Sequence, residues 1–233
     1  KVWTRDPLPG DTERSLISLT KDDLRLPEAE REYVALEFTA DRAFDGVWAL
    51  QASYVWSMSI GNYEGTVLSD NGQIDAGTTI LYDHPGLADN QYGYLPNHRM
   101  HQFKLRGSYQ VLPDLLIGGN FQLMSPRKYG CLGVHPTDAH AAGYGASSRY
   151  CDGVAVRRGE AFETDWVASV DLSARYEVPM SVPGNLVLRA DIFNVFDSAG
   201  VTTANERGDL ANGGADPNYQ KPITYQSPRT VGI

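Results

Sequence analysis

Hydrophobic and polar residues alternate along much of this chain with a period of two. From Trp48 to Ile60 every second residue is hydrophobic, and the intervening residues are small or polar except for Val55. Because successive side chains of a β-strand point to opposite faces, this pattern predicts a strand with one apolar face. No long segment shows the 3.6-residue period of an amphipathic helix. The pattern therefore predicts an all-β, antiparallel fold.

Five further segments show the same alternation, at residues 34–38, 103–109, 115–123, 166–177 and 186–192. In each of them one face is hydrophobic and the other is largely polar. The charged residues of these segments stand on the polar face: Glu37, Lys104, Arg106, Asp171, Arg175, Glu177, Arg189 and Asp191. Such side chains are stable only in water or in ion pairs, so the polar face is expected to line an aqueous space.

Short and long connections alternate strictly between these segments. The short ones are 41–45, 112–114 and 179–184, and the long ones, rich in Gly, Asn, Asp and Pro, are 61–97, 125–160 and 197–228. Loops of this length are uncommon in compact soluble domains. Outer-membrane barrels gather long loops at one end and short turns at the other, whereas a soluble β-sandwich has no reason to do so.

The spacing of aromatic residues fits the thickness of a membrane. Trp48 and Trp56 stand eight residues apart on one face, which corresponds to about 20 Å along the membrane normal for a tilted strand. Trp166 and Tyr176 give about 25 Å, and an apolar band of about 25 Å edged by aromatic residues is typical of these barrels. The sequence therefore predicts a transmembrane barrel segment of the bacterial outer membrane. A lectin-like soluble or surface β-sandwich with long ligand-binding loops is the main alternative, and an enzyme barrel comes third.

Composition removes other classes of function. The chain has 233 residues, and 20 Lys and Arg against 29 Asp and Glu give a net charge of −9. This balance argues against a nucleic-acid partner, because phosphate contacts need clustered basic residues. No nucleophile elbow, P-loop or Gly-rich dinucleotide motif occurs, so neither catalysis nor a cofactor is expected. The chain begins at Lys1 without a signal-like segment, which suggests a piece of a longer protein.

The two cysteines lie in one long connection. Cys131 and Cys151 do not form a C-x-x-C motif, and a disulfide between them is favoured over two free thiols. A disulfide would place this loop in an oxidising compartment.

Several motifs, in their order and spacing, resemble one family. They are residues 48–57 (WALQASYVWS), 61–65 (GNYEG), 69–73 (SDNGQ), 95–99 (LPNHR), 101–104 (HQFK), 134–138 (VHPTD), 190–197 (ADIFNVFD) and 225–229 (YQSPR). From about Arg31 onward the chain resembles the C-terminal barrel of Oar-like TonB-dependent outer-membrane receptors. Such a receptor binds a ligand at its extracellular loops and imports it through the barrel.

The resemblance implies a 22-stranded barrel with an N-terminal plug, often preceded by a carboxypeptidase-regulatory-like domain. Seven strands beginning near Arg31, Gly46, His98, Leu115, Phe162, Asn185 and Arg229 would form its last third. Residues 31–233 would be a barrel part that is incomplete at both ends, and residues 1–30 an extracellular loop or partial strand. The implied partners are outer-membrane lipid, the plug, the remaining strands, the TonB complex reached through the absent N-terminal part, and an extracellular ligand. The long loops would lie outside the cell, and the turns at Asp41, Pro113 and Pro183 in the periplasm.

Candidate ligand contacts are the charged residues of the polar face: Glu37, Lys104, Arg106, Asp171, Arg175, Arg189 and Asp191. Their guanidinium and ammonium groups offer fixed donors beside carboxylates. Alternatively, these residues pair with one another and with the plug.

Two loop features suggest cations. The connection 61–97 contains Glu64, Asp70, Asp75, Asp83 and Asp89 but no Lys or Arg, which predicts a surface of net charge −5. Such a surface favours divalent cations or basic partners over anions, although a merely solvated acidic loop fits equally well. Asp70 and Asp75 depart from the calcium-loop pattern, and Asn71-Gly72 is explained by a turn.

The histidines do not make a recognised metal site. His98 and His101 should point to opposite faces of a strand, which prevents chelation of one ion. His135, Asp138 and His140 are a ligand-like mixture between the cysteines, but a solvated loop is the expected structure there.

Overall fold

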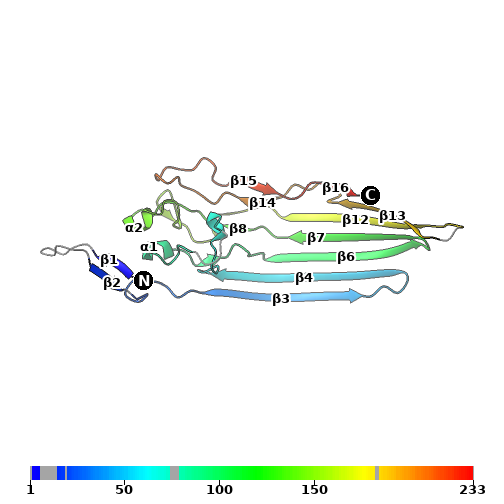
Figure 1. Cartoon of the computed structure of the whole chain (residues 1–233), viewed down its shortest axis with the longest axis horizontal. Helices are drawn as coiled ribbons and strands as arrows, with labels where there is room; N and C mark the ends of the chain where they lie inside the picture. The colour runs from blue at the N-terminus through cyan, green and yellow to red at the C-terminus, as the bar shows by residue number, and fades with distance from the viewer. Residues whose placement is uncertain (1, 6–14, 19, 74–78, 182–183, 233) are drawn as a thin grey trace.

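One antiparallel sheet dominates the computed structural model, which describes residues 2–5, 15–18, 20–73, 79–181 and 184–232 (Figure 1). Its long path contains β3 (Arg31–Arg42), β4 (Trp48–Gly61), β6 (His101–Leu112), β7 (Leu115–Met124), β12 (Val167–Val178), β13 (Leu186–Phe193) and β16 (Thr230–Gly232). Each strand of this path pairs with the next in sequence, and β5 (Gly93–Tyr94) pairs with β4. The all-β meander predicted from the alternation is confirmed.

The register aligns like residues across the sheet. One polar row runs through Asp41, Gln51, Arg106, Asn120 and Asp171. The adjacent apolar row runs through Ala40, Ala52, Leu105, Phe121 and Val170. Because a shift of one residue would exchange the two faces, this register keeps one continuous polar face and one continuous apolar face over five strands.

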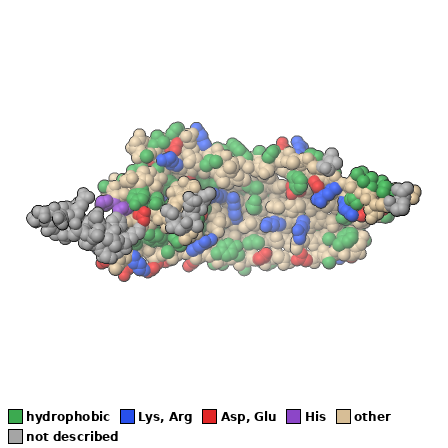
Figure 2. All heavy atoms as spheres, viewed as in Figure 1, with side chains coloured by type: hydrophobic (Ala, Val, Ile, Leu, Met, Phe, Trp, Pro, Cys, Tyr) green, Lys and Arg blue, Asp and Glu red, His purple; other side chains and the backbone are tan. Residues whose placement is uncertain are grey.

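The apolar face of the sheet is not covered by a second layer among the described residues. Its large side chains stay exposed to solvent: Leu36, Phe38, Tyr109, Ile117, Leu172, Tyr176 and Leu188. Charged side chains are spread over the strands on the face seen in Figure 2. A sandwich would bury the apolar face between two sheets, so the β-sandwich alternative is wrong for this chain.

Long and short connections lie at opposite ends of the sheet (Figure 1). The long ones, 62–100, 125–166 and 194–229, gather at one end, which we call the loop end. The other end carries the short turns 43–47 and 113–114, together with the connection between β12 and β13. The predicted alternation of loop lengths is confirmed, although residues 182–183 and Asp75 lie outside the described part of the chain.

Two strand starts differ from the prediction. β6 begins at His101 rather than near His98, and β12 begins at Val167 rather than near Phe162. Phe162 instead opens β11 (Phe162–Glu163), which pairs with β8 (Lys128–Tyr129) away from the main sheet. Alternation continues from Trp166 back to Phe162, so local pattern alone does not show where β12 begins.

Most of the buried apolar residues belong to the long connections. They are Leu68, Leu81, Leu87, Leu95, Tyr129, Cys131, Leu132, Ala141 and Ala204. The remaining short elements are β1 (Val2–Arg5), β2 (Ser15–Ser18), η1 (Ser69–Asn71), α1 (Pro85–Ala88), α2 (Ala139–Ala142), β9 (Tyr150–Cys151), β10 (Val154–Ala155), β14 (Val201–Ala204) and β15 (Pro222–Tyr225). Neither these helices nor any other helix of the described residues is long and apolar enough to cross a membrane.

Candidate functional site

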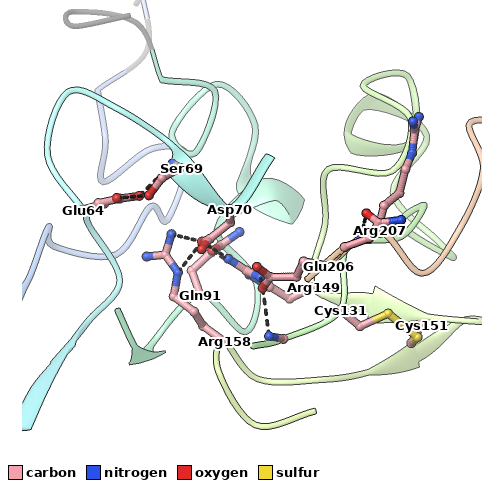
Figure 3. A network of polar contacts seen from close by, with 12 residues as sticks. Glu64, Ser69, Asp70, Gln91, Cys131, Arg149, Cys151, Arg158, Glu206 and Arg207 are labelled. Atoms are coloured by element: carbon pink, nitrogen blue, oxygen red, sulfur yellow. Dashed lines mark hydrogen bonds and ion pairs between the residues drawn. A yellow bond between two sulfur atoms is a disulfide. The ribbon is translucent and has the colours of Figure 1, made fainter. Parts of the chain in front are cut away.

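A carboxylate surrounded by arginines lies inside the loop end (Figure 3). η1 carries Asp70, whose side chain is only 3% exposed. Its Oδ2 accepts hydrogen bonds from Arg158 Nε at 2.9 Å and Nη2 at 2.5 Å, and it also pairs with Arg149. Arg127 Nη2 lies 3.8 Å from the other carboxylate oxygen. One carboxylate therefore faces three guanidinium groups in a site that water scarcely reaches.

Arg149 connects all three long loops. It is fully buried and donates from Nε to Gln91 Oε1 at 3.1 Å and from Nη1 to Glu206 Oε1 at 2.6 Å. Asp70 and Gln91 belong to the first long loop, Arg149 to the second and Glu206 to the third. Because a buried charge without partners is costly, each loop supplies groups that the others need. We call Asp70, Arg127, Arg149, Arg158 and Glu206 the charged core.

The two carboxylates of the charged core have opposite pKa shifts. Burial alone would raise the pKa of Asp70, but Arg149 and Arg158 outweigh burial and hold the pKa below its ordinary value. Burial and the nearby Asp70 raise the pKa of Glu206, against the opposing effect of Arg149. Asp70 is therefore the principal negative charge of the core.

A disulfide lies beside the charged core. Cys131 and Cys151 are bonded, with Cα atoms 5.7 Å apart, so the predicted pairing is confirmed. The third loop runs directly against it, because Leu132 N donates to Glu206 O and Gly208 N donates to Leu132 O, each at 2.8 Å. A Cβ at position 208 would overlap the Cys131 sulfur, so glycine permits this close approach. The disulfide thus helps to place Glu206 next to Arg149.

The charged core borders a cavity of about 540 Å³ between the three loops. Asp70, Arg127 and Glu206 reach its surface, as do Tyr129 and Arg207. Neutral polar side chains complete the wall: Ser69, Asn71, Ser147, Thr203 and Asn205. The volume lies within the range of small-molecule sites in proteins.

The charged residues predicted on the polar face are brought together as expected, with one exception. Glu37, Lys104 and Arg106 line one hollow of about 400 Å³. Arg106, Asp171, Arg189 and Asp191 line another of about 850 Å³. Arg175 lines neither hollow and pairs with Glu177 along its own strand at 2.6 Å. Ligand binding by these residues stays a prediction.

The acidic first loop is not the free acidic surface that its composition predicts. Asp70 is buried among arginines, Glu64 accepts hydrogen bonds from Ser69, and Asp89 lies 3.1 Å from His135. The side chains that pair with Asp70 and Asp89 come from the second loop. The predicted net charge of −5 counted the residues of the first loop alone. The sequence could have indicated this pairing, because residues 125–160 contain five Lys and Arg against three Asp and Glu. Two neighbouring loops of opposite charge are expected to pair.

Of the three ligand-like residues between the cysteines, His135 is buried, Asp138 is half-buried and His140 is exposed, so the expected solvated loop is found in part. His135 is 6% exposed, and its Nδ1 accepts from the backbone of Asp138 at 2.8 Å.

His98, in the first long loop, is also buried. Burial, reinforced by nearby Lys128 and Arg99, lowers the pKa of His98 to about 4. Within the described ranges no group of three or more His, Cys, Asp or Glu is placed to hold a metal ion.

Sequence comparison identifies a similar curated protein, while no family model matches the chain. This protein is the TonB-dependent transporter Oar of Myxococcus xanthus, 24% identical over 88% of this chain and 22% of its own length. The chain thus spans about a fifth of the relative that it matches.

Solved structures with a similar chain path are also receptors. The ferric-catecholate import receptor Fiu of E. coli K12 has a TM-score of 0.49 and 16% identity, covering 99% of this chain and 22% of Fiu. FpvA of P. aeruginosa, solved with heterologous pyoverdines, has a TM-score of 0.48 and 15% identity, with coverages of 99% and 22%. The similarity to Oar confirms the resemblance that the sequence motifs indicate. The chain is therefore similar, over most of its length, to part of a TonB-dependent transporter of the Oar type.

Proposed function

We propose that this chain forms part of the barrel wall of a TonB-dependent outer-membrane transporter, with its loop end at the extracellular mouth. The observation that carries this proposal is the unbroken apolar face beside an unbroken polar face across five paired strands. In a bilayer the apolar face contacts lipid and the polar face lines the lumen. Binding and passage of a ligand along such a wall require no covalent chemistry, which makes transport rather than catalysis the proposed role.

The two outer strands of the sheet indicate which partners the wall needs. β3 and β16 end the strand order, and no pairing joins them within the described ranges. An unpaired strand edge in lipid leaves backbone N–H and C=O groups without partners, which costs several kcal/mol per group. We therefore infer that further strands of the same barrel pair with β3 and β16. A plug filling the lumen would supply partners for the charges of the polar face, and it would carry the contact with the TonB complex.

Limited proteolysis of intact cells tests the proposed orientation. Arg157 and Arg207 are exposed at the loop end, whereas Arg42 is exposed at the turn end. Trypsin added to cells that make the full-length transporter should cut at Arg157 or Arg207 and spare Arg42. After the outer membrane is permeabilised, Arg42 should become a cutting site. Cleavage at Arg42 in intact cells would contradict the orientation, and recovery of the protein in the soluble fraction would contradict the barrel wall itself.

A further inference from the structure

The charged core contains more guanidinium groups than carboxylates to neutralise them, three against two. Arg99 lies within electrostatic reach of Arg127, and Glu64 within reach of Arg158. Arg99 adds one guanidinium group and Glu64 one carboxylate to the charged core. Counted together, the charged core and these two neighbours have four guanidinium groups against three carboxylates. Lys128 does not change this balance, because it pairs with Glu163. A buried group with excess positive charge favours a further anion.

Two guanidinium nitrogens of this cluster have no hydrogen-bond partner within the described residues. They are Arg127 Nε and Arg158 Nη1, and both atoms are buried. A buried donor without an acceptor is destabilising, and more so when the group is charged. Native proteins usually satisfy such donors with water or a bound ion. The unsatisfied Nε of Arg127 and the excess positive charge both favour an anion near Arg127.

The cavity brings this positive charge to a surface that a solute can reach. Arg127 lines it, and its guanidinium carbon lies 4.4 Å from the centre of the Tyr129 ring, which limits its orientation. Arg207 lines the same cavity from the third loop and is exposed. The acidic groups on the wall, Asp70 and Glu206, are already bonded to arginines. The cavity is therefore a poor site for a cation and a suitable one for an anion.

We propose that this cavity binds an anionic solute through a carboxylate or phosphate group held by Arg127, with Arg207 at the rim. The planar guanidinium can bind such a group with two parallel hydrogen bonds, which a lysine cannot do. The side-chain amide of Asn205 adds a neutral donor, its Nδ2, for a hydroxyl or carbonyl group of the same molecule. This inference rests on the proposed function, for which it names the chemical class of the solute captured at the mouth.

Isothermal titration of the purified full-length transporter with citrate tests the proposal. Saturable binding is expected, and it should weaken as the salt concentration rises because charge pairing contributes to it. Arg127→Gln should reduce citrate affinity at least tenfold, and Arg207→Gln about threefold. Arg157→Gln is the matched control, because it removes the same charge from an exposed residue of the same loop as Arg127 that does not line the cavity. The affinity of this control should stay within twofold of that of the unmodified protein.

A second variant separates anion binding from loss of loop structure. Asn205→Asp keeps the shape of a cavity residue and adds a negative charge, so it should also weaken citrate binding at least fivefold without removing an arginine. Formation of the Cys131–Cys151 disulfide reports whether the loops fold in each variant. The proposal would be overturned if the unmodified transporter did not bind citrate, or if the Arg127 and Asn205 variants bound it as tightly as the unmodified protein. In either case, recovery of the protein in the outer membrane would still support the proposed barrel-wall function.

Discussion

The strands and the loop end of this protein differ in where their apolar side chains lie. Every residue of β3 is exposed, including Leu36 and Phe38. At the loop end, by contrast, Leu81, Leu87 and Leu95 are at most 1% exposed. In a soluble β protein the strands supply the core and the loops lie over the surface. Here the loops form a core of their own, while the strands present their apolar side chains outward.

This difference shows that the two regions depend on different surroundings. The sheet has no covering layer within the described ranges, and in the proposed barrel wall its apolar face contacts lipid and its edges pair with further strands. The loop end holds itself together through apolar packing, a disulfide and buried ion pairs. Changes in one region should therefore impair assembly in the membrane, and changes in the other should loosen the loops without preventing insertion.

The largest effect is expected from Asp70→Asn. This change removes the principal negative charge beside three guanidinium groups, and breaking a buried ion pair in this way costs about 3–5 kcal/mol. Hydrogen exchange of the loop-end backbone in the full-length transporter should become much faster, while that of β4 to β7 stays slow. Asp89→Asn is the control, because Asp89 is half-exposed and its loss should change exchange little. Unchanged exchange in the Asp70 variant would disprove the coupling of the three loops.

A charge on the apolar face should have the next largest effect. Ala52→Arg or Val170→Arg places a guanidinium near the middle of the apolar band and should cost about 2–4 kcal/mol. Ser53→Arg, on the polar face, should be mild. The measurement is the amount of heat-modifiable barrel recovered from the outer membrane. Equal recovery of the Ala52 and Ser53 variants would argue against a lipid-facing sheet.

Loss of the disulfide should have a comparable effect that is limited to the loops. The bond closes a segment with a sequence separation of 20 residues. In the chain-entropy model such a closure contributes about 3 kcal/mol. Replacing both Cys131 and Cys151 by Ser should speed tryptic cleavage at Arg157 while barrel insertion is retained. Mass spectrometry of non-reduced peptides checks the bond itself, and two alkylatable thiols in protein from cells would refute it.

The smallest effect is expected from Glu206→Gln. Since the folded-state pKa of Glu206 is raised above 4.5, its proton favours the folded loops at low pH, and this contribution is lost as the pH rises through the raised value. The lowered pKa of Asp70 has the opposite effect on the stability of the folded loops. Its stabilising contribution is present above pH 3.8 and is lost only as the pH falls below that value. Glutamine keeps the acceptor for Arg149, so loop stability at pH 7 should change by about 1 kcal/mol or less. Loop proteolysis should then vary less between pH 5 and pH 8 than in the unmodified protein, and an unaltered pH profile would refute the assignment.

The sequence by itself determined the wall of this protein. The two faces of the sheet follow from side-chain alternation, which depends only on backbone geometry within each strand. Spacing along the chain also predicted three further features. They are the placement of Trp48 and Trp56 on one face, the order of long and short connections, and the pairing of Cys131 with Cys151. The start of β12 could not be predicted, because alternation extends from Trp166 back to Phe162, which lies outside the main sheet.

Only the tertiary structure decided the contents of the loop end. Asp70 meets Arg149 across 79 positions and Arg158 across 88, and Arg149 meets Glu206 across 57. No periodicity connects such distant positions, and the composition of the first loop alone predicted an acidic surface where the folded protein has an arginine-rich core. The physical reason is that burial makes an isolated charge costly, so the loops fold to bring opposite charges together from different parts of the chain.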